Sequence, residues 1–150
     1  GRPITQASDP DKAARAIAKE LRHRGIAFDQ VVCSPAQRAR ETVERLADGL
    51  KYDPNVRFEP AMYLPSTETL TNVIHGLPDE AETIMIVGHN PGFHDLVLRL
   101  TKDDNQGHRE RVEGNFPTAA FSLISFPVER WADIRSATGE IRELILPREL

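Results

Sequence analysis

Cysteine and long apolar runs are nearly absent from this sequence, and each absence excludes a class of protein. The single cysteine, Cys33, rules out an internal disulfide and favours a reducing, cytoplasmic setting. No stretch approaches the roughly 20 consecutive apolar residues of a membrane-spanning helix. The formal net charge is -4, so the chain has no overall excess of positive charge for coating nucleic acid or an acidic membrane. We therefore expect neither a nucleic acid nor a membrane as a partner.

The composition is that of a folded chain. Of its 150 residues, 39% are hydrophobic and 28% are charged, which is typical of a globular domain rather than a disordered segment. This length suits one domain with a sizeable core. Because no repeat, low-complexity segment or linker divides the chain, we expect a single domain over residues 1–150.

Helical and strand-like patterns alternate along the chain. Thr83–Gly88, for example, is a nearly continuous apolar run, as in a strand buried on both faces of a parallel sheet. Predicted helices begin near Asp9, Ser34, Ser66 and Asn90, and predicted strands lie at Gln30–Cys33, Val56–Phe58, Thr83–Gly88, Ala119–Phe126, Arg130–Arg135 and Ile141–Leu146. We expect a surface loop over Lys102–Asn115. The alternation predicts an α/β fold with a mixed sheet.

An Arg-His pair before a glycine, Arg22-His23-Arg24-Gly25, is a first candidate for phosphoryl transfer. The apolar spacing, however, places this pair in the last turn of a helix that ends at Gly25. Cationic side chains are favoured there by the carbonyl end of the helix dipole. We therefore interpret Arg22-His23 as a solvated helix end rather than a catalytic pair.

Two strand-to-helix junctions resemble each other and are better candidates. One is Val-Val-Cys followed by Ser34-Pro35, and the other is Ile-Val-Gly-His89 followed by Asn90-Pro91. In open α/β sheets, ligands bind outside the carboxyl ends of the strands, where helix N-termini attract anions. Arg38 lies one turn into the first helix, and a guanidinium can bind two phosphate oxygens. Arg38 and His89 together predict a phosphate pocket.

Each of these residues also has a purely structural interpretation. His89 could bond to main-chain atoms, Arg38 could pair with Glu41 or Glu44, and Ser34 could serve only as a helix cap. Cys33 could act as a thiol nucleophile with His89 as base, but its place at the end of an apolar strand favours a buried, inert cysteine. Because both junctions carry suitable residues, the pocket is the stronger interpretation for Arg38 and His89.

The motifs at these junctions resemble those of the histidine phosphatase superfamily. Cys33–Thr42 (CSPAQRARET) and Val87–Gly92 (VGHNPG) are similar to two of its signatures, the second in the form of bacterial SixA-type phosphohistidine phosphatases. Shorter matches are Arg2-Pro3-Ile4-Thr5, Met62-Tyr63, Phe116-Pro117-Thr118-Ala119, Trp131-Ala132 and Leu146-Pro147-Arg148. The resemblance covers essentially the whole chain. It implies a three-layer α/β/α sandwich around a mixed, mostly parallel sheet.

The resemblance also implies a mechanism without metal or cofactor. A histidine attacks phosphorus and becomes phosphorylated, while arginines and a second histidine hold the phosphoryl oxygens. On this reading Arg38 is one phosphate clamp, His89 is the second histidine, and Ser34 caps its helix and contacts phosphate. Glu68, near a predicted helix start, is a candidate general acid, although the helix dipole alone would favour a carboxylate there.

One part of the family pattern does not occur in the sequence. The resemblance places the nucleophile in a Leu-Arg-His strand ahead of Arg2-Pro3-Ile4-Thr5, and that strand is absent from the sequence. We therefore expect the nucleophilic histidine upstream of residue 1. Without that strand, the sheet should lose a central strand and expose unpaired edges.

The resemblance favours a protein substrate, the phosphohistidine of a phosphotransfer domain. The short stretch Lys51–Glu80 leaves no room for a large insertion over the pocket, so a protein side chain could enter. Two alternatives stay open: a small-molecule phosphoesterase of the same superfamily, and a non-catalytic module that binds phosphate or protein.

Overall fold

A computed structural model describes residues 2–8, 13–51, 53–90, 92–117 and 120–146, with the side chains of 2–8 and 13 left aside. Its elements in chain order are β1 (Arg2–Ser8), α1 (Ala13–His23), β2 (Gln30–Cys33), α2 (Gln37–Leu50), β3 (Val56–Phe58), η1 (Pro60–Met62), α3 (Thr67–His75), β4 (Ile84–Gly88), α4 (Gly92–Leu100), α5 (His108–Gly114), β5 (Phe121–Phe126), η2 (Trp131–Asp133) and β6 (Glu140–Ile145). The η elements are short 3₁₀ turns.

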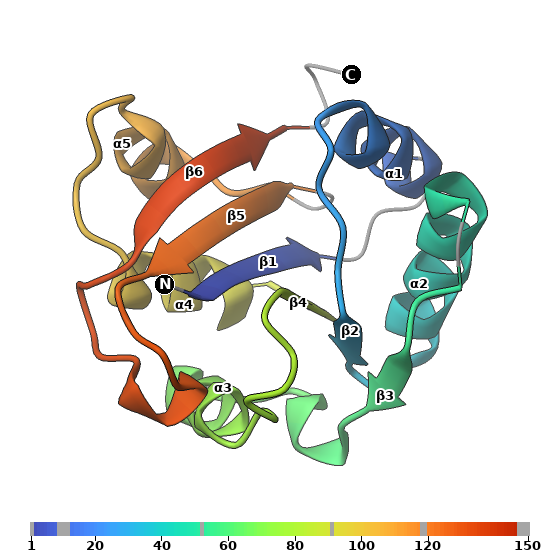
Figure 1. Ribbon diagram of the computed structural model, residues 1–150, viewed down its shortest axis with the longest axis horizontal. Coiled ribbons are helices and arrows are strands. Elements are labelled where there is room, and N and C mark those ends of the chain that lie inside the picture. Colours follow the sequence, from blue (N-terminus) through green and yellow to red (C-terminus); the bar gives the residue numbers. More distant parts are fainter. Residues whose placement is uncertain (1, 9–12, 52, 91, 118–119, 147–150) are drawn as a thin grey trace.

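Six strands form one mixed sheet in the order β3-β2-β4-β1-β5-β6 (Figure 1). The pairs β3–β2, β2–β4 and β4–β1 are parallel, and β1–β5 and β5–β6 are antiparallel. The predicted mixed, mostly parallel sheet is therefore confirmed. Because parallel strands end at the same edge of the sheet, Ser34 after β2 and His89 after β4 lie side by side.

Helices cover both faces of the sheet, as Figure 1 shows. One apolar cluster joins α1 and α2 to the sheet, and the other joins α3, α4 and α5 to its opposite face. The buried strand β4 contributes to both, because its side chains alternate: Met85 and Val87 face the first cluster, Ile84 and Ile86 the second. This arrangement is the predicted three-layer sandwich.

The end of α1 agrees with the sequence prediction. The helix stops at His23, and Gly25 follows with a φ of 72°, a left-handed conformation that glycine adopts without strain. The Ile26 N–H then donates to the Leu21 carbonyl oxygen at 2.9 Å. The predicted helix start at Asp9-Pro10 lies outside the described residues.

Three expectations differ from the structure. Lys102–Asn115 is not only loop, because it contains α5, a short helix with Val112 as its buried residue. The expected strand Arg130–Arg135 is instead the 3₁₀ turn η2. The buried residues Trp131 and Ile134 are three positions apart, whereas a strand would bury every second residue. The central place in the sheet is also filled: Arg2–Ser8 pairs with both β4 and β5 there, so the expected gap does not occur.

Candidate functional site

The candidate site lies where β2 and β4 end. These strands are parallel neighbours, with Cys33 opposite Val87 in the ladder. The Ser34 N–H donates to the Val87 carbonyl oxygen at 2.9 Å, so the pairing continues one residue beyond β2. His89 directly follows β4, and the two strand-to-helix junctions meet at one edge of the sheet.

Ser34 and His89 are in direct contact. The Ser34 hydroxyl oxygen lies 3.3 Å from His89 Nε2, a hydrogen bond whose direction depends on the histidine tautomer. Ser34 is fully buried and His89 is half-buried. The same hydroxyl accepts from the Ala36 N–H at 3.3 Å. The expected N-cap role of Ser34 is therefore wrong. Ala36 is the N-cap residue of α2, and the Ser34 side chain stabilises the turn before this helix.

Asn90 stabilises the second junction, at the helix start that the sequence predicts. Its amide oxygen accepts from the His94 N–H at 3.2 Å, and its amide nitrogen donates to the Phe116 carbonyl oxygen at 2.7 Å. The Phe93 N–H donates to the His89 carbonyl at 3.1 Å, which starts the helical pattern of α4. An Asn before a proline signals such a turn, but its partner 26 residues away could not be predicted.

Arg38 lies four residues beyond Ser34, in the first turn of α2, with an exposed side chain. Its main-chain carbonyl accepts from the Thr42 hydroxyl at 2.9 Å, within the helix. It is placed at the same edge of the sheet as His89, because α2 begins where β2 ends. That the guanidinium and the imidazole grip one oxyanion stays a prediction.

A cavity of about 220 Å³ adjoins His89. Its lining residues come from the segment before α3 and from the start of α4: Leu64, Pro65, Ser66, Thr67, His89, Asn90, Gly92 and Asp95. The predicted acid Glu68 is exposed in the first turn of α3, directly after this set. The carboxylate that the lining does contain is Asp95, in the first turn of α4 and six residues after His89, and no sequence motif pointed to it.

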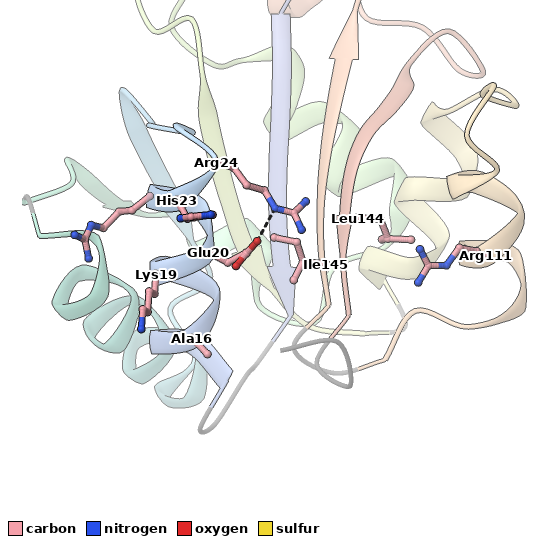
Figure 2. Close-up of a pocket in the computed structure, with 9 residues that line it drawn as sticks. Ala16, Lys19, Glu20, His23, Arg24, Arg111, Leu144 and Ile145 are labelled. Atoms are coloured by element: carbon pink, nitrogen blue, oxygen red, sulfur yellow. Dashed lines mark hydrogen bonds and ion pairs between the residues drawn. The ribbon is translucent and has the colours of Figure 1, made fainter.

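The larger cavity in Figure 2, about 890 Å³, lies beside α1 and β6 and includes Arg22 and His23. Arg22 donates to the Gly49 carbonyl oxygen at 3.3 Å, and Arg24 pairs with Glu20 at 2.9 Å and with Glu143 at 2.6 Å. A phosphate here would face the carbonyl end of α1, which repels anions. Size alone therefore does not make this cavity the phosphate site.

Cys33 is unsuited to nucleophilic attack. Burial raises the pKa of its thiol to about 12, an effect that the positive charge of Arg40 only partly offsets. The thiol donates to the Ser34 carbonyl oxygen at 3.2 Å. A thiol in this state is almost entirely protonated at neutral pH, and the thiolate is the reactive form. The Cys-His alternative is therefore disfavoured.

Three other histidines bond to main-chain oxygens. Ring nitrogens of His75, His94 and His108 lie 2.8, 2.7 and 3.1 Å from the carbonyls of Ile134, Val112 and Ile141. Across the described ranges, no cluster of three or more His, Cys, Asp or Glu side chains could hold a metal ion. None of the five histidines of the sequence belongs to β1, the strand at the centre of the sheet.

Comparison with known proteins agrees with the motifs. The sequence model of the histidine phosphatase superfamily (branch 1) matches residues 10–62. An uncharacterized protein of Mycobacterium leprae is 30% identical over 129 residues, which are 85% of this chain and 77% of that protein. No described helix is long and apolar enough to cross a membrane.

Solved structures share the fold. One assigned as the phosphohistidine phosphatase SixA of Nakamurella multipartitia has a TM-score of 0.83 at 22% identity, covering 97% of this chain and 96% of that one. The protein histidine phosphatase SixA complexed with tungstate has a TM-score of 0.74 at 16% identity, covering 98% of both. The match of the family model to residues 10–62, together with the two junction motifs, places the chain in the histidine phosphatase superfamily, and the solved structures show the fold of its SixA-type members.

Proposed function

We propose that the protein is a cytoplasmic phosphatase that hydrolyses phosphohistidine on a phosphotransfer domain. The observation that carries the proposal is the Ser34–His89 contact at the edge where α2 and α4 begin. Helix N-termini attract anions, and an imidazole fixed by a buried hydroxyl is held ready to bind a phosphoryl oxygen. Membership of a phosphatase superfamily and the likeness to SixA structures support the same substrate class.

The proposed reaction has two displacements. A histidine nitrogen attacks phosphorus, the P–N bond of the substrate breaks, and the leaving imidazole keeps the electron pair and takes a proton. Water then attacks the phosphorylated enzyme histidine, and inorganic phosphate leaves. Arg38 and His89 stabilise the charge on the phosphoryl oxygens, and Ser34 orients His89. Glu68 remains the proposed acid, and Asp95 is the carboxylate that lines the cavity.

The nucleophile is the part of this proposal that the printed sequence does not supply. We expect it on a Leu-Arg-His strand encoded ahead of Gly1. Such a strand would take the place between β4 and β5 that Arg2–Ser8 holds here. Reading the gene upstream of Gly1 tests this directly. Absence of the motif would favour the non-catalytic binding module.

The activity is tested with the full-length protein on a phosphorylated phosphotransfer domain and on simple phosphoesters. We expect clear preference for the phosphorylated domain. His89→Ala should lower kcat about 100-fold or more, the usual effect of removing an oxyanion donor. The matched control is His23→Ala, which should change kcat less than twofold. A preference for phosphoesters would reject the substrate, and equal losses in both variants would reject the site.

A further inference from the structure

Exposed apolar side chains gather in one short segment beside the candidate site. Within the described residues, the large hydrophobic side chains that are exposed are Phe58 (40%), Tyr63 (60%) and Leu64 (80%), all between the end of β3 and the start of α3. The Arg40 guanidinium lies 4.3 Å from the centre of the Phe58 ring and partly covers it. Tyr63 and Leu64 form the projecting part of this segment, which we call the Tyr63–Leu64 turn.

The Tyr63–Leu64 turn is firmly anchored at both ends. Before it, the Glu59 N–H donates to the Cys33 carbonyl at 2.9 Å, and Met62 is buried in the core. The Tyr63 N–H donates to the Pro60 carbonyl at 3.2 Å. After it, the Ser66 hydroxyl accepts from the Thr69 N–H at 3.1 Å and caps α3. The exposure of the turn therefore does not come from a loose loop.

Leu64 combines two unfavourable features. Its φ is 51°, the left-handed region that a residue with a β-carbon rarely adopts, and its apolar side chain is mostly in water. Glycine would remove the backbone strain, and a polar residue would remove the exposed apolar surface. Strained residues are concentrated at functional sites, and exposed apolar patches mark interaction surfaces.

The position of the turn indicates what it contacts. Leu64 lines the cavity that adjoins His89. A histidine side chain is short, so a protein that brings its phosphohistidine to His89 must press its own surface against the rim of that cavity. Leu64 is the large exposed apolar side chain of that rim, and the exposed Tyr63 directly precedes it in the chain. Tyrosine is also one of the residue types that contribute most to protein interfaces.

We propose that the Tyr63–Leu64 turn is the docking contact for the folded protein domain that carries the phosphohistidine. The inference rests on the proposed function and adds to it the surface that selects a protein over a small phosphate compound. Tyr63 and Leu64 bind an apolar hollow on the partner next to its phosphorylated residue. They take no part in the chemistry.

The test compares two substrates of the full-length enzyme: phosphorylated phosphotransfer domains encoded in the same genome, and phosphoimidazole. The variant carries Tyr63→Ser and Leu64→Gly together. We divide kcat/KM for the protein substrate by kcat/KM for phosphoimidazole, and we expect this ratio to fall about tenfold in the variant, mainly because KM for the protein substrate rises. The control is Ala137→Gly, which removes a comparable positive φ, 58°, in the turn before β6. That variant should keep the wild-type ratio.

The possible outcomes separate the two proposals. If the wild-type enzyme hydrolyses the phosphorylated domain and the double variant keeps its substrate ratio, the docking inference is wrong while the proposed function stands. If the variant instead turns a dimer into a monomer and keeps protein turnover, the turn is a self-association surface and the inference is again wrong. No turnover of any phosphorylated domain by the wild-type enzyme rejects the proposed substrate and the docking contact together.

Discussion

At the scale of single residues, the type of hydrogen-bond partner distinguishes His89 from the other histidines, which the sequence alone does not. His75, His94 and His108 each bond to a main-chain carbonyl and thereby tie a helix to a distant segment. His89 bonds to a side-chain hydroxyl at a strand end instead. A carbonyl partner requires an N–H on the ring nitrogen that it binds, whereas a hydroxyl can donate or accept. The contact with Ser34 is therefore compatible with either tautomer of His89.

Asp104 should make the stability depend on pH. Its side chain, 2% exposed, accepts from the N–H group of Gln106, ahead of α5, and from those of His108 and Arg109 in the first turn of α5. Burial would raise the pKa of Asp104, but the N–H donors of Arg109 and His108 and the His108 ring outweigh it and lower that pKa. Since the folded-state pKa is depressed, this stabilisation is full above the unfolded-state value of about 3.9 and is lost as pH falls through the folded-state value.

Asp104→Asn should therefore lower the free energy of unfolding at pH 7 by about 1–2 kcal/mol. The difference in stability between wild type and variant should stay constant from pH 7 to about pH 5 and shrink as pH falls further to about 3. Urea unfolding across this range measures it. The control is Asp103→Asn, since that neighbouring carboxylate is 92% exposed and 3.9 Å from Arg109. It should change stability by less than about 0.5 kcal/mol. A difference that stays constant down to about pH 3 would contradict the role of the Asp104 charge.

The sequence could predict the types of site residue but not most of their contacts. Ser34 and His89 were predicted together, because each ends an apolar run before a helix and the carboxyl ends of parallel strands share one edge. Asn90 and Asp95 were missed as site residues, since their positions depend on how α4 packs. The Leu64 φ of 51° leaves no signal in a sequence, because leucine favours no such conformation.

At the scale of elements, length and periodicity decided which predictions succeeded. The runs that became β2 and β4 are strongly apolar and are followed by Ser-Pro and Asn-Pro, so both were found. The helix α5 has one buried residue, Val112, which is too little for a periodic signal. The expected strand around Trp131 was wrong because the buried residues recur every third position, as in a 3₁₀ turn.

The contact between β4 and α4 predicts the effect of a single methyl group at Gly88. A Cβ there would lie 2.8 Å from the Cε1 and Cζ atoms of the fully buried Phe93 ring. Gly88→Ala should cost about 1–3 kcal/mol of stability through this overlap. Because His89 is the next residue, the same strain should displace it and reduce turnover. Urea unfolding and a phosphatase assay measure the two effects.

Adding Phe93→Leu should recover part of the loss in Gly88→Ala, since the smaller side chain makes room for the methyl group. The control is Gly114→Ala in α5, where an added Cβ meets nothing within 4 Å. That change should be neutral. If the two substitutions at Gly88 and Phe93 were simply additive, the close contact would not be the cause.

At the scale of the whole molecule, one strand joins two apolar layers. β4 gives alternate side chains to the two clusters, so the separation of either layer from the sheet exposes one face of this strand to water. The single tryptophan, Trp131, lies in the α3–α4–α5 layer and its indole N–H donates to the carbonyls of Pro78 and Ala81 at 3.1 and 3.0 Å. Its fluorescence therefore reports on one layer alone.

A cavity made in the opposite layer should change the Trp131 signal. Leu21 is fully buried in the cluster of α1 and α2, and Leu21→Ala should lower stability by about 2–5 kcal/mol. If β4 couples the layers, the midpoints from Trp131 fluorescence and from far-UV circular dichroism should shift together in urea. Ile74→Ala, a cavity within the tryptophan's own layer, is the matched variant and should also give coincident midpoints. If the fluorescence midpoint of Leu21→Ala stays at the wild-type value, the two layers unfold separately. The junction between β4 and α4 would then hold His89 in place independently of α1 and α2.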